Sequence, residues 1–407
     1  MNAPEPLLSV LSPADTYEQV SRASNDIAGR LAERLRRHTQ GEVLITAADR
    51  GRYATDASIY QVMPVGVFLP RYAHEVPEAM AICRDLGVPI LPRGGGTSQC
   101  GQTVGAGLVI DHSKHLRGLL HLDLAQRCAE VQPGLVLDHL NRQLKPHGLW
   151  FAVDVSTGAQ ATLGGMAGNN SCGSRSIAYG NMVHNVLGLT AWQSDGALLQ
   201  LGAYQHSSGR ARELGDFVKH LADGLGGEIA LHWPKLLRRV AGYNLDIFCN
   251  QSERPYTTDG SVNLAHLLVG SEGTLAMTQS ISLKLSELPG ARVLGVVNFP
   301  SFHRAMEATQ HIVKLGEGSL TAVELVDRTM LALSLENPAF AATIRQALIG
   351  TPEAILLVEF AGTNKNELKL KLRQLAALMG DLGLPGSVVE LSDELSQKNC
   401  GMCAKLA

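Results

Sequence analysis

The sequence contains neither of the two common phosphate-binding loops. No GxxxxGK[ST] occurs in it, and no GxGxxG leads into a helical stretch. These are the loops with which P-loop enzymes and Rossmann-type nicotinamide enzymes hold phosphate groups. Their absence excludes a Walker loop and leaves a Rossmann-type nicotinamide enzyme as a minor alternative.

A concentrated basic surface and a long apolar run are also missing. The formal net charge is −3, the first ten residues contain no basic segment, and apolar runs such as residues 354–358 have the length of a strand. Nucleic-acid binding needs clustered cations, and a membrane span needs about 20 apolar residues. We therefore expect no nucleic-acid partner and no transmembrane segment. The expected location is the cytoplasm, and peripheral contact with the inner membrane is compatible with it.

Cysteine is scarce, with seven residues scattered along the chain. The odd number argues against a disulfide framework and fits a reducing compartment. Only Cys400 and Cys403 have the spacing of a metal-ligand pair, and a zinc or iron–sulfur site needs about four ligands. We expect no metal site in this chain.

Glycine is abundant instead, with 42 residues, many of them in tight clusters. A length of 407 residues with 45% hydrophobic and 18% charged residues suits two or three globular domains. The glycine clusters mark places where the backbone takes unusual dihedrals or approaches another group closely.

The order of the expected elements indicates the α+β class. Helical periodicity and stop signals predict helices, and short β-type runs predict strands, with glycine-rich loops over residues 93–98 and 163–173. Residues 206–260 are charged and irregular and are expected to be an insertion. The predicted helices cover residues 12–39, 76–86 and 135–145, and the predicted extended segments cover 43–45, 88–92, 108–110, 127–131, 186–192 and 197–201.

The first glycine loop has the chemistry of a phosphate site. Its consecutive backbone N–H groups are unobstructed by side chains, and two hydroxyls follow them, as a pyrophosphate requires. An ordinary glycine turn is the alternative. The loop consists of Arg93, Gly94, Gly95, Gly96, Thr97 and Ser98.

The second glycine-rich segment, residues 162–173, suits a polar heterocycle, because its glycines allow close approach and its asparagines supply amide groups. Cys172 within it is interpreted as a small packing residue rather than a nucleophile. His112, His115 and His184 could be ligands or bases, but satisfied structural histidines are the favoured interpretation.

Five ordered motifs together resemble the FAD-linked oxidases with a PCMH-type (vanillyl-alcohol-oxidase-type) FAD-binding domain. The resemblance covers residues 45–290, more loosely to 330, and is to the group of D-lactate dehydrogenase, glycolate oxidase and D-2-hydroxyglutarate dehydrogenase. It is closest to the N-terminal part of large bacterial proteins that fuse such a flavoprotein to an iron–sulfur module. The motifs are PRGGGTS at 92–98, VQPG at 131–134, GLWF at 148–151 with Asp154, the segment from Gly164 to Gly180, and GSEGTL at 270–275.

The resemblance implies an extended FAD, with its pyrophosphate on the first loop, its flavin against the second, and its adenosine end along Glu272 and Gly273. Covalent members carry a histidine in or beside the first loop, where this chain has Thr97 and Ser98, so dissociable FAD is expected. The residues assigned to the cofactor are Arg93, Gly94, Gly95, Gly96, Thr97, Ser98, Pro133, Gly134, Gly164, Gly165, Gly168, Asn169, Ser171, Gly173, Tyr179, Gly180, Glu272 and Gly273.

The resemblance also implies a domain division. An N-terminal helical segment is expected over residues 1–44, a two-subdomain FAD-binding domain over 45–290, and a cap domain over 291–407. In metal-assisted members the metal ligands and much of the substrate clamp follow a stretch equivalent to the end of this chain. We therefore expect a truncated cap, an iron–sulfur cluster only in a missing C-terminal part or a partner, and no catalytic base among these residues.

The expected reaction is oxidation of a D-2-hydroxy acid to the 2-oxo acid, with the hydride passing to FAD and the electrons then to a quinone, a cytochrome or an iron–sulfur partner. Two alternatives remain open. One is an FAD-binding module that does not turn over substrate, and the other is an NADPH-dependent reductase on the same fold.

Overall fold

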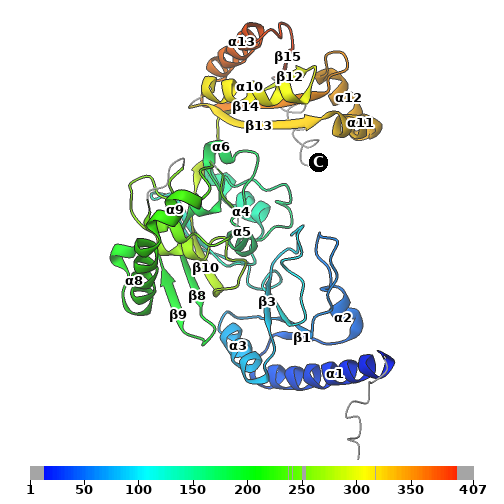
Figure 1. Ribbon diagram of the computed structural model, residues 1–407, viewed down its shortest axis with the longest axis vertical. Helices are drawn as coiled ribbons and strands as arrows, with labels where there is room; N and C mark the ends of the chain where they lie inside the picture. Colours follow the sequence, from blue (N-terminus) through cyan, green and yellow to red (C-terminus); the bar gives the residue numbers. More distant parts are fainter. Residues whose placement is uncertain (1–12, 237, 241, 250–253, 317, 392–407) are drawn as a thin grey trace, which may run out of the picture.

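The computed structural model describes residues 13–236, 238–240, 242–249, 254–316 and 318–391. Three parts follow one another along the long axis: an N-terminal part (13–116), a middle part (117–288) and a C-terminal part (289–391) (Figure 1). Each contains helices and a sheet, which confirms the α+β prediction. Ser12, where the first predicted helix begins, and the pair Cys400 and Cys403 lie outside the described residues.

The N-terminal part is a four-stranded sheet in the order β1-β2-β4-β3, in which β2, β4 and β3 run parallel. Leu31 and Leu35 of the first helix belong to its core, so this helix is part of the unit. The second long helix ends where Gly87 takes φ 65°, a conformation that favours glycine. The elements are α1 Pro13–His38, β1 Glu42–Leu44, α2 Ala47–Gly51, β2 Gly66–Leu69, α3 Glu75–Leu86, β3 Ile90–Arg93 and β4 Leu108–Asp111.

The middle part is built on a five-stranded antiparallel sheet in the order β5-β6-β10-β8-β9. Its central strand comes last in the chain and pairs with β6 on one side and β8 on the other. The elements are β5 Leu119–Asp123, β6 Cys128–Val131, α4 Leu137–Leu144, η1 Lys145–His147, β7 Leu149–Trp150, α5 Leu163–Asn169, α6 Ser176–Tyr179, α7 Met182–Asn185, β8 Val186–Trp192, β9 Leu198–Leu201, η2 Tyr204–His206, α8 Gly209–Gly224, α9 Gly226–His232, η3 Leu245–Phe248, η4 Leu264–Leu267 and β10 Met277–Lys284.

The second glycine-rich segment is half helix, which corrects the prediction of a loop over 163–173. Residues 163–169 form α5, whose start is capped by the Thr162 hydroxyl and whose end has Asn170 in the left-handed conformation. Leu163 and Met166 are buried on it. Tertiary packing of these apolar residues overrides the low helix propensity of glycine.

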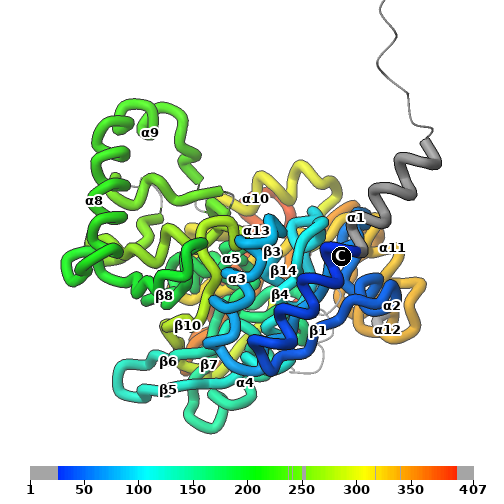
Figure 2. The backbone as a smooth tube through the Cα atoms, turned by 90° about the horizontal axis from the view of Figure 1, so that it is seen from below, coloured from blue at the N-terminus to red at the C-terminus, as the bar shows by residue number. Residues whose placement is uncertain are grey.

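Residues 206–260 are also more regular than predicted, because they contain the 16-residue helix α8 followed by α9. Both helices project from the body of the molecule (Figure 2). The residues that α8 buries are Ala211, Gly215 and Ala222. Small residues on the buried face leave little hydrophobic periodicity in the sequence, so the pattern does not predict this helix.

The C-terminal part is an antiparallel sheet in the order β13-β14-β12-β15. Helices α10 and α13 pack on one face, and α11 and α12 on the other. Among the described residues, no helix is both long and apolar enough to cross a membrane. Strand β11, Ser286–Glu287, ends the middle part and pairs with β7. The elements of the C-terminal part are β12 Ala291–Phe299, α10 Phe302–Leu315, β13 Leu320–Asp327, α11 Arg328–Glu336, α12 Pro338–Ala347, β14 Ala354–Gly362, α13 Lys365–Asp381 and β15 Val388–Leu391.

Candidate functional site

A cavity of about 430 Å³ lies where the N-terminal and middle parts meet. Three segments far apart in the sequence form it: the loop after β3, the helix α5 with the residues after it, and the segment before β10. Most of the predicted cofactor residues line it, namely Arg93, Gly94, Gly95, Gly96, Thr97, Ser98, Pro133, Gly164, Gly165, Gly168, Asn169, Ser171, Glu272 and Gly273.

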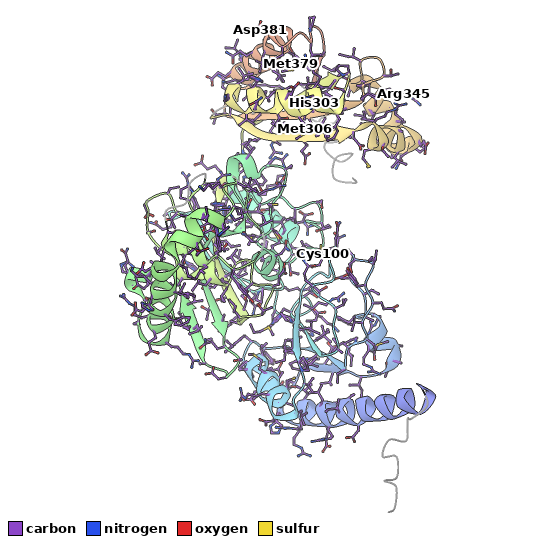
Figure 3. The ribbon with its side chains drawn as sticks, viewed as in Figure 1. Cys100, His303, Met306, Arg345, Met379 and Asp381 are labelled. Atoms are coloured by element: carbon purple, nitrogen blue, oxygen red, sulfur yellow. The ribbon has the colours of Figure 1, made fainter. Side chains whose placement is uncertain are left out.

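The first loop offers free hydrogen-bond donors to this cavity. Within the described part of the chain, the backbone N–H groups of residues 95–98 donate to no protein acceptor, and Gly96 has φ 64°. Successive amides in such a conformation form a concave nest that binds anions. Cys100, farther along the same loop, also lines the cavity, and Figure 3 places it on the side turned toward the C-terminal part.

Packing between loops accounts for several of the glycines. A Cβ atom at Gly94 would lie 2.0 Å from Thr162 Oγ1, and one at Gly95 would lie 2.3 Å from the Gln160 carbonyl oxygen. At Gly164 it would meet Pro133 at 2.6 Å. The first loop therefore rests directly on the segment that leads into α5, and glycine is required there whether or not a ligand is bound.

The Arg93 side chain supports the first loop through hydrogen bonds to three backbone carbonyl oxygens. Its guanidinium donates to the carbonyl oxygens of Thr55 at 2.7 Å, Thr103 at 3.2 Å and Tyr53 at 3.3 Å, and it lies over the Tyr53 ring. Burial lowers the pKa of Arg93, although nearby Asp111 opposes the shift. Because these carbonyls occupy the guanidinium, its role is to hold the loop in place.

Glu272 joins the three segments. Its Oε1 accepts hydrogen bonds from Asn169 Nδ2 at 2.8 Å and from Gln102 Nε2 at 3.4 Å, and its backbone N–H donates to the Gly168 carbonyl. It has φ 52°, which is uncommon for a residue other than glycine. The strained backbone places the carboxylate where both neighbouring segments can reach it.

Four predicted residues do not line the cavity. The positions of Gly134 and Gly173 are set by packing, because a Cβ atom would lie 2.0 Å from the His112 carbonyl oxygen and 2.2 Å from that of Asp154, respectively. Gly180 has φ 77°, a conformation that favours glycine. The Tyr179 ring packs edge-on against the Trp150 ring, with 5.4 Å between the ring centroids. In the sequence, a glycine needed for packing looks the same as one needed for ligand approach.

The cavity also has lining residues that the sequence interpretation did not assign to the cofactor. Many of them follow directly on a motif that carries the resemblance, as Gln99 and residues 155–157 do, and this position could have signalled them. They include Gln99, Cys100, Gln102, Thr103, His112, Val155, Ser156, Thr157, Ala161, Thr162, Met166, Ala167, Cys172, Ser271, Ala276, Met277 and Thr278.

The three candidate histidines fall in different surroundings. His112 is buried in the cavity lining, and burial lowers its pKa to about 4. His115 pairs with Glu42 at 3.0 Å. His184 accepts a hydrogen bond from the Asn181 backbone through Nδ1. The pairing of His115 with Glu42 supports the structural interpretation for this residue. The Nε2 atoms of His112 and His184 are buried and have no hydrogen-bond partner among the described residues, so the interpretation stays a prediction for these two.

Two protein families match the chain. Residues 64–202 match the family described as FAD binding domain, and residues 288–401 match the family described as FAD linked oxidases, C-terminal domain. The first match contains the glycine loop and α5, and the second contains the C-terminal sheet.

Curated relatives and solved structures agree with these matches. D-2-hydroxyglutarate dehydrogenase of Haemophilus influenzae is 31% identical over 361 residues, which cover 84% of this chain and 34% of that protein. A probable mitochondrial D-lactate dehydrogenase of Danio rerio is 29% identical, covering 80% of this chain and 54% of the relative. The chain spans about a third of the length of the first of these relatives.

Alkyldihydroxyacetonephosphate synthase shares the fold, with a TM-score of 0.63 at 18% identity over 89% of this chain and 60% of that one. At this identity the likeness shows the fold alone. The family assignment comes from the two family matches and the curated relatives. The chain belongs to the FAD-linked oxidase group.

Proposed function

We propose that the cavity holds FAD non-covalently. A volume of about 430 Å³ is within the range of ligand pockets, and the four free amides of residues 95–98 suit the pyrophosphate. No histidine is present in this loop to form a covalent bond. The family match to an FAD binding domain supports the same cofactor.

In this proposal the first loop binds the pyrophosphate through its backbone, α5 and Ser171 lie along the flavin, and Glu272 and Gly273 hold the adenosine end. FAD, when bound, supplies the group that accepts a hydride from a substrate carbon. The protein contributes orientation and a site partly closed to water, which can lower a barrier by about 7–11 kcal/mol when the reacting groups are well placed. We assign no residue as the base.

We further propose that the substrate is a D-2-hydroxy acid of the D-2-hydroxyglutarate or D-lactate type, oxidised to the 2-oxo acid. The observation that carries this proposal is the 31% identity with a D-2-hydroxyglutarate dehydrogenase across 84% of the chain. The electrons would pass to a quinone, a cytochrome or an iron–sulfur protein. The free cysteines among the described residues are consistent with a cytoplasmic location.

The flavin spectrum tests both proposals. Purified protein, reconstituted with FAD, is mixed anaerobically with D-2-hydroxyglutarate, D-lactate or their L-enantiomers. We expect bleaching of the flavin band with one of the D-acids and none with the L-acids. Bound flavin that no D-2-hydroxy acid bleaches would retain the cofactor assignment and contradict the substrate.

A second candidate function is FAD binding without turnover of a hydroxy acid by this chain. The residues that line the cavity account for binding of the cofactor, and we assign none of them as a base. The same spectra distinguish the two functions, because this one predicts tight FAD binding and no bleaching by any acid in the panel.

A further inference from the structure

Arg175 lies between two carboxylates that belong to different parts of the molecule. Its Nε and Nη2 donate to Oε1 and Oε2 of Glu359 on β14, each at 2.8 Å, and its Nη1 donates to Asp154 Oδ2 at 2.8 Å. Asp154 is in the middle part and Glu359 is in the C-terminal part. Three of the five guanidinium N–H groups are therefore committed to a bridge between the two parts.

The bridge is buried. The side chains of Arg175, Asp154 and Glu359 are 17%, 9% and 16% exposed, and Thr321 Oγ1 on β13 also donates to Glu359 Oε1 at 2.7 Å. Burial alone would raise the pKa of Glu359, but the hydrogen bonds and charge of Arg175 hold it below its ordinary value. The carboxylate therefore stays ionised and paired at neutral pH.

An apolar contact accompanies the ion pair. Helix α6, which begins directly after Arg175, lies against the edge strand β13, as Figure 1 shows. Ile177 of this helix packs on the core of the C-terminal part. Apolar contact supplies attraction without fixing a rotation, whereas a bidentate guanidinium–carboxylate pair fixes both distance and orientation.

Asp154 and Arg175, the two residues of the bridge in the middle part, are close in sequence to residues that line the cavity. Residues 155–157, directly after Asp154, line the cavity, and so do Ser171 and Cys172, a few residues before Arg175. Asp154 additionally accepts hydrogen bonds from Ser174 Oγ and the Arg175 backbone N–H. A movement of the C-terminal sheet relative to Arg175 therefore also moves this sheet relative to two segments that line the cavity.

We propose that Arg175 is a positioning residue that fixes the C-terminal part relative to the middle part, and so relative to the cavity, through its bidentate pair with Glu359. Its guanidinium is already occupied by protein carboxylates, so it does not serve as a clamp for the substrate carboxylate. The proposal does not depend on which hydroxy acid is the substrate.

Hydrogen exchange of the intact chain tests the proposal through peptides that cover α6 and β13. Arg175→Met keeps much of the side-chain volume and removes the bridge. We expect exchange in both segments to rise by about tenfold or more, with FAD affinity within about threefold of wild type, because Arg175 does not line the cavity. Arg175→Lys keeps the charge but not the paired geometry and should resemble the Met variant.

Two further variants complete the experiment. Glu359→Gln should raise exchange in the same segments, and the double variant should be no worse than Arg175→Met, since both changes break one interaction. Arg328→Met is the matched control, because it removes an exposed ion pair with Glu353 within the C-terminal part. The proposal would be overturned if Arg175→Lys kept the wild-type exchange rates, or if the increases in exchange of the two single variants added up in the double variant. An equal increase in Arg328→Met would overturn it as well.

Discussion

At the scale of single residues, the glycines of the cavity differ in what a side chain would meet. Gly168 is the informative one, because its added Cβ atom would come no closer than 3.7 Å to Glu272 and it lies within helix α5. Gly94 and Gly95, in contrast, leave no room for a methyl group even in the absence of a ligand. A substitution at Gly168 therefore separates ligand approach from protein packing.

Gly168→Ala should weaken FAD binding without harming the fold. In the absence of FAD we expect a free energy of unfolding equal to wild type or higher by about 0.5–1 kcal/mol, since alanine is the better helix former. If FAD approaches this backbone, the methyl group should raise its Kd by about tenfold or more. Fluorescence titration of the FAD-free protein gives the Kd, and an unchanged value would show that the cofactor does not pass over Gly168.

Glu272 can be tested through the hydrogen bonds that join the segments. Glu272→Gln keeps an acceptor for Asn169, whereas Glu272→Ala removes it and leaves the Asn169 amide without a partner. Asn169 is half-buried, and the loss of a typical hydrogen bond costs about 0.5–1.5 kcal/mol of stability, so the Ala variant should melt at a lower temperature than the Gln variant. Equal melting temperatures for the two variants would contradict this role.

The first loop could be recognised from the sequence because three adjacent glycines cost more backbone entropy than a turn requires. Gly134 and Gly173 could not be separated from the cavity glycines, because the backbone that each one abuts comes from a distant segment. The same limit applies to Glu272, whose partners Asn169 and Gln102 are 103 and 170 residues away.

At the scale of elements, strands and long amphipathic helices were the predictable features. Helix α3 and its glycine stop follow the pattern of apolar residues, and α1 lies over nearly the residues that the sequence predicts. Helix α5 could not be predicted because its glycines have a low helix propensity. Helix α8 could not be predicted because the alanines and the glycine on its buried face give weak periodicity. Bridges such as the one from Arg175 to Glu359 span 184 residues and leave no local signal.

The C-terminal helix α13 gives a prediction at this scale. Leu372 belongs to this helix and is fully buried, in a core separate from the cores that surround the cavity. Leu372→Ala should cost about 2–5 kcal/mol of the stability of the C-terminal part, while the Kd for FAD stays near the wild-type value. Chemical denaturation of the FAD-free protein, followed by FAD titration of the folded variant, measures both quantities. A large loss of FAD affinity would mean that the two cores fold as one.

At the scale of the whole molecule, two buried histidines, His112 and His266, and the half-buried His184 contribute a dependence of stability on pH. Burial lowers the pKa values of His112, His184 and His266 to about 4. In the unfolded chain these groups titrate near 6.5. Between these two values the unfolded state binds protons that the folded state does not, so stability falls as the pH falls.

We expect the free energy of unfolding to drop by about 4 kcal/mol between pH 7.5 and pH 5.5, the sum of about 1.4 kcal/mol for each histidine. His266→Gln should reduce this dependence by about a third, since glutamine does not titrate. Urea unfolding at the two pH values is the measurement. A stability independent of pH over this interval would mean that the histidines are not held neutral in the fold.

The position of β10 has a consequence for synthesis of the chain. This strand occupies the centre of the middle sheet, yet it follows β6 by about 150 residues and β8 by about 90. As the chain leaves the ribosome, β6 and β8 therefore each have one unpaired edge until β10 has been synthesised. During this time the cavity residues that directly precede β10 are also absent. Open strand edges promote association between chains. Nascent chains that stop between residues 202 and 276 should accordingly be the ones that depend most on chaperones.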